Sequence, residues 1–131
     1  MTLDDIVKNA TSIIVYNDGI KTEYTSDSVN FTNVVDAFVE MAKSGHEMPA
    51  FGVSLHDSTI VSIQTGIWVE FVFEETKVYN EMPFETLLIN VEKDWSGFNI
   101  IRKHDSKYEG RCFYINLENA DMSKLYELLT Q

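Results

Sequence analysis

The spacing of hydrophobic and polar positions in this chain changes near residue 50. Before that point, apolar residues recur every three or four positions over residues 3–10 and 30–45, which predicts two helices. The longer helix carries one continuous apolar stripe, formed by Phe31, Val34, Val35, Phe38, Met41 and Ala42. We expect Thr2 and Asp5 to cap the first helix, Asn30 to cap the second, and Gly45 to end the second in a left-handed conformation.

Asp18 and Gly19 separate two β-prone runs between these helices. A two-residue Asp-Gly turn suits a tight hairpin, because both central positions of a type I′ turn need a positive φ. The sequence therefore predicts a hairpin with strands over residues 12–17 and 20–25.

Residues 50–118 alternate apolar and polar positions with a period of two, which predicts strands. The candidate strands are 50–56, 59–65, 67–74, 85–92, 98–104 and 111–117. Their short connections favour an antiparallel meander. Residues 76–83 either extend the strand 67–74 or form the longest loop, and Pro83 is expected to end a strand ladder unless it lies on an edge.

A last helix is predicted over residues 119–129, with Asn119 or Asp121 as its N-cap. The order helix, hairpin, helix, meander, helix indicates one α+β domain spanning residues 1–131. We expect an antiparallel meander sheet of about six to eight strands, packed on one face by two or three helices.

Glu70 is the carboxylate in the middle of the most hydrophobic run, residues 66–75. Because burying a lone carboxylate is energetically unfavourable, Glu70 should lie on a solvated face, be paired with another group, or serve in binding or catalysis. Alternation places it beside Trp68, on the sheet face that points away from the helices. The same sorting of the neighbouring strands places four more polar or aromatic residues on that face, namely Gln64, Asn90, Tyr114 and Asn116.

Two interpretations of this face stay open. Its aromatic and amide side chains could surround Glu70 as the wall of a ligand pocket. An ordinary solvent-facing sheet carries the same residue types, with Trp68 and Tyr114 as cross-strand packing. The second interpretation is favoured, because none of these residues requires a catalytic or ligand-binding role.

The chain holds 21 acidic and 10 basic residues, a formal net charge of -11. Such a surface repels nucleic-acid phosphates and anionic membranes, so the expected partner is a basic protein. Arg102 and Arg111 are the only arginines, and each is expected to pair with a carboxylate such as Glu70, Glu92 or Glu109. No apolar run approaches the length of a membrane span and no leader is apparent, so a cytoplasmic protein is expected.

Other candidate chemistry is sparse. The triplet His-Asp-Ser occurs at 56–58 and 104–106, where turns explain it better than a catalytic triad. His56, Asp57 and His104 lack the close-spaced ligand pair of a zinc site, so no metal is expected. No cofactor is expected either, because a Gly-rich phosphate loop is missing. Cys112 is predicted to be a small half-buried hydrophobe.

The sequence favours a non-catalytic binding or regulatory protein that acts through a protein partner. Trp95, on the turn "KDWSG", is a candidate exposed anchor for that partner. The alternative is a small-molecule-binding domain, or an enzyme, with Glu70 as its charged contact or general base. A homodimer formed through sheet edges is a third hypothesis.

Overall fold

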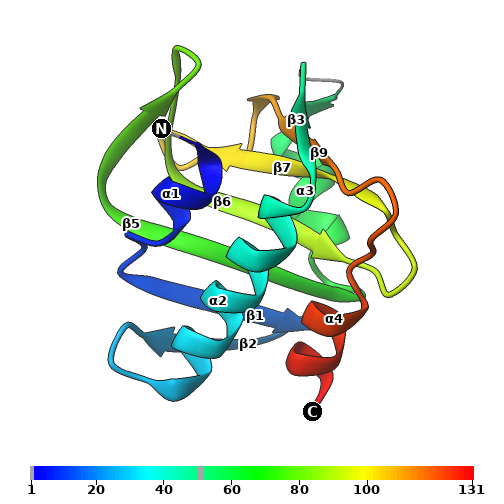
Figure 1. The fold of residues 1–131 in the computed structure, drawn as a ribbon. Coiled ribbons are helices and arrows are strands. Elements are labelled where there is room, and N and C mark those ends of the chain that lie inside the picture. Colours follow the sequence, from blue (N-terminus) through cyan, green and yellow to red (C-terminus); the bar gives the residue numbers. More distant parts are fainter. Residues whose placement is uncertain (1, 50–51) are drawn as a thin grey trace.

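Seven antiparallel strands form the main sheet, in the order β2-β1-β5-β6-β7-β9-β3, and β4 pairs with β8 in a small second sheet (Figure 1). The computed structural model describes residues 2–49 and 52–131. Together with four helices, the strands make the single α+β domain that the sequence predicts.

The bounds of the elements are as follows. The helices are α1 (Leu3–Val7), α2 (Val29–Lys43), α3 (His56–Ser62) and α4 (Ser123–Thr130). The strands are β1 (Ser12–Asn17), β2 (Ile20–Thr25), β3 (His46–Met48), β4 (Val53–Ser54), β5 (Ile67–Tyr79), β6 (Met82–Val91), β7 (Gly97–Lys103), β8 (Gly110–Arg111) and β9 (Phe113–Asn116).

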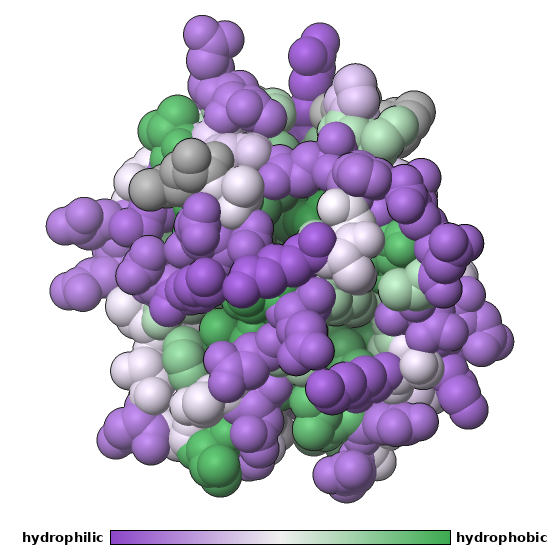
Figure 2. Space-filling model, viewed as in Figure 1, coloured by the Kyte–Doolittle hydropathy of each residue, from purple (hydrophilic) through white to green (hydrophobic). Residues whose placement is uncertain are grey.

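The main core lies between one face of the sheet and helices α1, α2 and α4 (Figure 1). Phe38 of α2 is at its centre, with its ring 4.9 Å from that of Phe71 and 6.1 Å from that of Phe98. The outer surface of this helical layer is mostly hydrophilic (Figure 2). Helix α3 lies behind the sheet, on the opposite face (Figure 1). None of the helices in the described part of the chain is both long and apolar enough to cross a membrane.

Two hairpins follow turn chemistry visible in the sequence. Asp18 and Gly19 have φ of 48° and 87°, and they join β1 to β2 with the predicted strand bounds. Asn80 and Glu81, with φ of 49° and 65°, join β5 to β6 in the same way. Residues 76–79 therefore extend the predicted strand, residues 80 and 81 form a tight turn, and residues 82 and 83 begin β6, so no long loop is present here. Pro83 is tolerated because β7 pairs with β6 only at residues 86–88, which leaves an edge at Pro83.

The strand predicted over residues 59–65 is wrong, because residues 56–62 form helix α3. Thr59 and Ile63 are buried and four positions apart, which is the spacing of one side of a helix. The strand predicted over 50–56 shortens to β4 within the described residues. A short apolar run fits a strand and a buried helix equally well, so tertiary packing, and not the local pattern, determines that this segment is helical.

The helix ends differ from the prediction in two places. Ser28, not Asn30, caps α2, because its side chain accepts the Phe31 N–H at 3.1 Å. Gly45 does not adopt the left-handed conformation. A Cβ at Gly45 would lie 2.7 Å from the carbonyl oxygen of Asn116, so the glycine allows a close approach to β9. The structure begins α4 at Ser123, later than predicted.

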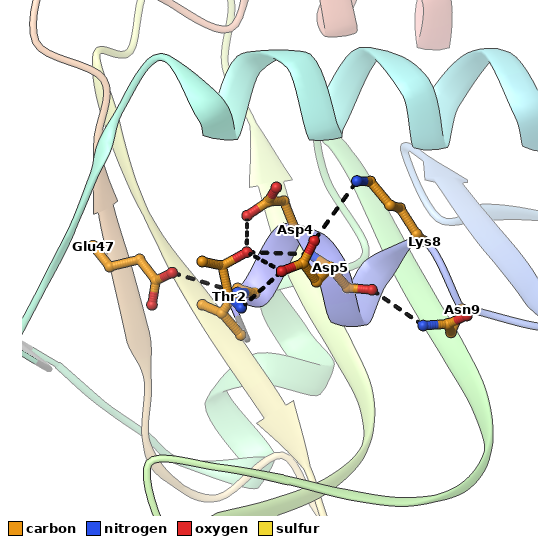
Figure 3. Close-up of polar contacts among 7 residues, drawn as sticks. Thr2, Asp4, Asp5, Lys8, Asn9 and Glu47 are labelled. Atoms are coloured by element: carbon orange, nitrogen blue, oxygen red, sulfur yellow. Dashed lines mark hydrogen bonds and ion pairs between the residues drawn. The ribbon is translucent and has the colours of Figure 1, made fainter.

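Helix α1 is shorter than predicted, but its capping box is present (Figure 3). The Asp5 carboxylate accepts the Thr2 N–H at 3.1 Å, and the Thr2 hydroxyl accepts the Asp5 N–H at 3.4 Å. Glu47 of β3 accepts the Leu3 N–H at 3.4 Å and the Tyr79 hydroxyl at 2.5 Å. Burial first, and then the Glu47 carboxylate, raise the pKa of Tyr79 to about 12. These contacts fasten α1 to β3, and β3 to the end of β5.

Candidate functional site

Glu70 lies on the sheet face opposite α1, α2 and α4, as alternation predicts, yet only 1% of it is exposed. The face around it is covered by a second layer, made of residues 52–63 and 104–112. We call this the α3 layer, since it contains α3 together with β4, β8 and the loop before β8. The favoured expectation of a solvent-facing surface is therefore wrong at Glu70.

Backbone and side-chain hydrogen bonds join the two segments of the α3 layer. The Cys112 N–H donates to the Gly52 carbonyl at 2.9 Å. The Ser54 hydroxyl donates to the Tyr108 carbonyl at 3.0 Å, and the Tyr108 N–H donates to Nδ1 of His56 at 3.1 Å. With the β4–β8 pairing, these bonds place Tyr108 directly beneath the start of α3.

Three hydroxyl groups surround the Glu70 carboxylate. Oη of Tyr108 lies 2.9 and 2.8 Å from the two carboxylate oxygens and shares its hydrogen between them. Oη of Tyr16 donates to Oε1 at 2.7 Å, and Oγ1 of Thr86 donates to Oε2 at 2.5 Å. The donors come from β1, β6 and the α3 layer, so one carboxylate connects three parts of the fold.

No lysine or arginine of the described residues makes an ion pair with Glu70. The carboxylate is satisfied by neutral donors alone, and each hydrogen bond to a charged group is worth about 1.5–3 kcal/mol. Burial first, and then Glu70, raise the pKa values of Tyr108 and Tyr16. Both phenols therefore stay protonated as donors, and Glu70 is a structural acceptor rather than a group open to a ligand.

The Tyr108 ring is held on several sides. The His56 ring stacks on it at 5.9 Å with 15° between the planes, and Nζ of Lys103 lies 5.1 Å from the ring centroid. A small second hydrophobic cluster surrounds the ring, formed by Ile63, Trp68 and Leu88 with Tyr16 and Ile101 at its margin. This packing fixes the hydroxyl of Tyr108 against Glu70.

The predicted site residues do not converge on Glu70. Trp68 and Asn90 are cross-strand neighbours on its face. Their side chains are used locally, because Nε1 of Trp68 donates to the Thr65 carbonyl and Nδ2 of Asn90 donates to the Ile67 carbonyl, both at 2.9 Å. The structure thus places both residues as predicted without directing their polar atoms at the carboxylate.

The other three predicted residues lie further away. Tyr114 and Asn116 are on the same face but on β9, opposite Asn99 and Gly97 of β7. Gln64 is not in a strand, because it follows α3 in a turn against the β1–β2 hairpin. Its Oε1 lies 3.0 Å from where a Cβ at Gly19 would stand. Of the six predicted residues, Gln64 is the one that the wrong strand assignment displaced.

A pocket of about 340 Å³ lies between the α3 layer and the sheet. Of the predicted residues, Trp68 lines this pocket and Glu70 does not. The lining residues are Gly52, Val53, Ser54, Leu55, Ser58, Thr59, Ser62, Trp68, Asn99, Ile101 and Cys112. No charged side chain is among them. The sequence holds a signal for part of this lining, since Ser58 and Ser62 are four positions apart, as on one side of a helix, whereas Ser54 lies in β4.

A shallower hollow of about 410 Å³ adjoins the first at Asn99, which lines both. It is formed by the turn that carries Trp95 and by Tyr114 of β9. Trp95 is exposed, as the candidate anchor requires. Its carbonyl accepts the Met122 N–H at 3.1 Å, which fastens the turn to the residue before α4.

The predicted arginine–carboxylate pairs are absent from the described residues. Arg102 is buried and donates to two carbonyl oxygens instead, that of Pro83 at 2.7 Å and that of Arg111 at 2.8 Å. Burial lowers its pKa. The guanidinium thus joins the turn end of the β5–β6 hairpin to β8.

The structure does not bring His56, Asp57 and His104 together as metal ligands. His104 instead meets Glu85 and Asp105, with Nδ1 2.8 Å from Glu85 and Nε2 3.5 Å from Asp105. Burial would raise the pKa of Glu85, but hydrogen bonds from His104, the Asp105 N–H and Thr76 lower it. Glu85, His104 and Asp105 thus form a small polar cluster whose ligand atoms lie within 4.8 Å of one another.

Cys112 is a free, buried thiol. Burial raises its pKa, and hydrogen bonding with Ser54 offsets part of that rise. A protonated, enclosed thiol is a poor nucleophile, so Cys112 acts as the small hydrophobe that the sequence predicts.

No protein-family model, no curated protein and no solved structure matches this chain. Any assignment of function therefore rests on the residues described above.

Removing the Tyr108 hydroxyl should destabilise the fold. We expect Tyr108→Phe to lower the free energy of unfolding by about 1.5–3 kcal/mol, because the Glu70 carboxylate loses a buried donor. Tyr24→Phe is the matched control, since the Tyr24 hydroxyl has no hydrogen bond among the described residues. Urea unfolding followed by circular dichroism measures both variants. Equal stability of Tyr108→Phe and the native protein would contradict this role for Glu70.

Alkaline pH should destabilise the protein through two phenols, that of buried Tyr108 and that of half-buried Tyr16. An unfolded tyrosine releases its proton near pH 10, whereas folded Tyr108 and Tyr16 retain theirs above that pH. The unfolded state then binds fewer protons than the folded state, so stability is full below about pH 10 and falls as pH rises. Urea unfolding at a series of alkaline pH values measures this slope. Tyr108→Phe should flatten it, and an unchanged slope would sink the account.

Proposed function

We propose that this chain is a non-catalytic, cytoplasmic binding protein that docks a protein partner on its α3 layer. One observation carries the proposal. Four large apolar side chains of this layer are between 43% and 71% exposed, namely Val53, Leu55, Ile60 and Val61. Val53 and Leu55 line one pocket together with residues of α3. Exposed apolar side chains on one layer of a fold are typical of interaction sites.

The exposed side chains stand on a rigid support. Thr59 and Ile63 turn inward and anchor α3, while Ile60 and Val61 point out. The hydrogen bonds between the two segments of the layer, and those of Glu70 to Tyr108, hold that orientation without a partner. A preorganised surface loses little conformational entropy when a partner binds, which favours specific docking.

The chemistry of the surface describes the partner. The pocket has no charged lining residue, so it suits an apolar side chain of the partner. Ser58 and Ser62 offer hydroxyls, and Asn99 an amide, to backbone groups beside that side chain. Exposed Asp57 on α3 and the net charge of -11 favour a partner with a basic rim.

Trp95 provides a second anchor for the same partner. It lines the hollow that meets the pocket at Asn99, so one binding surface can cover both. Exposed tryptophans are enriched among residues that dominate interface energies.

The described polar groups support a non-catalytic role, because most are committed to the fold. The Glu70 carboxylate accepts hydrogen bonds from three hydroxyl groups, and Nδ1 of His56 accepts a hydrogen bond from the Tyr108 N–H. Burial keeps Cys112 protonated. The cytoplasmic part of the proposal is in keeping with this free thiol, since cytosolic cysteines are kept reduced.

The pocket also supports a second candidate, a neutral and largely apolar small molecule. Its volume of about 340 Å³ lies in the range of small-ligand sites. Trp68 would form an aromatic wall and the serine hydroxyls would orient the ligand. In this form the alternative no longer needs Glu70 as a contact.

A charge placed on α3 should abolish partner capture. We expect Val61→Asp to lose the protein that the native chain retains from its own cell extract. Val78→Asp, at a position that is 63% exposed at the tip of the β5–β6 hairpin, should retain it. Trp95→Ala should stay folded and weaken capture. Quantitative affinity capture measures all three, and equal loss in both aspartate variants would contradict docking on the α3 layer.

The two candidates differ in the mass of the bound species. A native mass spectrum of protein isolated gently from its own cells should show an added mass of protein size, absent from Val61→Asp. A small added mass, retained in Val61→Asp and lost on Ser62→Leu, would instead favour a ligand in the pocket. Ser62→Leu fills the pocket from α3, whereas Val61 is not among the residues that line it.

A further inference from the structure

Strand β2 is the longer of the two edges of the main sheet, with six residues against three in β3 (Figure 1). In the hairpin with β1, residues 20, 22 and 24 direct their backbone groups to β1, so residues 21, 23 and 25 direct theirs outward. The Thr25 carbonyl accepts the Ser28 N–H at 3.0 Å. The N–H and C=O groups of Lys21 and Glu23 therefore remain available along this edge.

The side chains of β2 divide between the two faces of the sheet. Lys21 and Glu23 share one face, opposite Tyr16 and Ile14 of β1. Ile20, Thr22 and Tyr24 share the other. Ile20 is 72% exposed, the most of any large hydrophobic side chain in the described residues. This edge thus combines open backbone groups, one charge of each sign and an unburied isoleucine.

We propose that β2 pairs antiparallel with β2 of a second copy of this chain, about a two-fold axis through Thr22. This interface is separate from the proposed function on the α3 layer. When a two-fold axis passes through a residue of an antiparallel pair, each face of one copy's sheet continues as the same face of the other copy's sheet. The axis at Thr22 therefore places Lys21 opposite Glu23 of the second copy. An axis at Lys21 or at Glu23 would place two like charges opposite each other. The charge pattern therefore selects one register.

The direction of the backbone hydrogen-bonding groups along β2 agrees with this register. Lys21 and Glu23 both direct their backbone groups outward, so each pairs with the other across the axis by an N–H···O=C bond in both directions. On the other face, Ile20 lies opposite Tyr24 of the second copy, which would bury the isoleucine. Backbone phase, charge and apolar contact all favour the same arrangement.

Two features oppose association. A lysine on an edge strand usually blocks pairing, but here Glu23 of the second copy supplies its counter-charge. The net charge of -11 on each copy causes long-range repulsion, which salt at physiological concentration screens beyond about 8 Å. The dimer should therefore be measured at that ionic strength.

Charge reversal tests the register directly. Sedimentation velocity of the full chain over three decades of concentration should show a monomer–dimer equilibrium. Lys21→Glu and Glu23→Lys should each weaken it about tenfold or more, because like charges then face each other. The double variant Lys21→Glu with Glu23→Lys should restore it. Lys93→Glu, which makes the same charge change on the β6–β7 turn, is the control and should leave dimerisation intact.

Glu23→Lys separates pairing from general repulsion. It makes the chain less acidic, so long-range repulsion alone predicts a tighter dimer, whereas the proposed register predicts a weaker one. Circular dichroism checks that each variant is folded. A monomer at every concentration, a dimer unaffected by either single reversal, or a double variant that fails to recover would each overturn the proposal.

Discussion

The buried carboxylate of Glu70 is the constraint on which the second face of the sheet depends. It has no cationic partner among the described residues, so its hydrogen bonds come from the hydroxyls of Tyr16, Thr86 and Tyr108. Tyr16 and Thr86 are already beside it in the sheet, but Tyr108 reaches it only if the loop before β8 folds back over the face. That loop brings β8 with it, β8 pairs with β4, and β4 leads into α3. One acceptor thus explains why a second layer exists.

The two faces of the sheet consequently serve different purposes. One face carries the main core beneath α1, α2 and α4, and the surface of that layer is hydrophilic. The other face supports the thin α3 layer, which does not bury all of its own apolar side chains. Of residues 55–63, only Thr59 and Ile63 are buried. The exposed apolar surface is a direct consequence of this geometry. Glu70 is therefore the support of the proposed docking surface and not part of it.

Local patterns predict most of the fold but little of the α3 layer. The Asp18-Gly19 turn, the stripe on α2 and the alternation around Glu70 are short-range signals, and the elements that they indicate are present. Residues 59–65 gave the wrong answer, because their apolar run fits two periods and non-local packing against Tyr108 decided between them. Alternation places Trp68 on the correct face of the sheet, but the pocket that it lines is not the one expected around Glu70. The partners of Glu70 could not be found, since sequence does not place β1 beside β5, and Tyr108 lies in a loop without periodicity.

Amide hydrogen exchange of Glu70→Gln, compared with the native protein, tests most directly whether Glu70 holds the second layer in place. The amide replaces one acceptor oxygen by a donor, so the hydroxyls of Tyr108 and its neighbours lose part of their bonding. We expect faster exchange in residues 52–63 and 104–112, with the protection of α2 retained, because the main core does not involve Glu70. Unchanged exchange, or an equal loss of protection in α2 and in the α3 layer, would contradict the central role of this carboxylate.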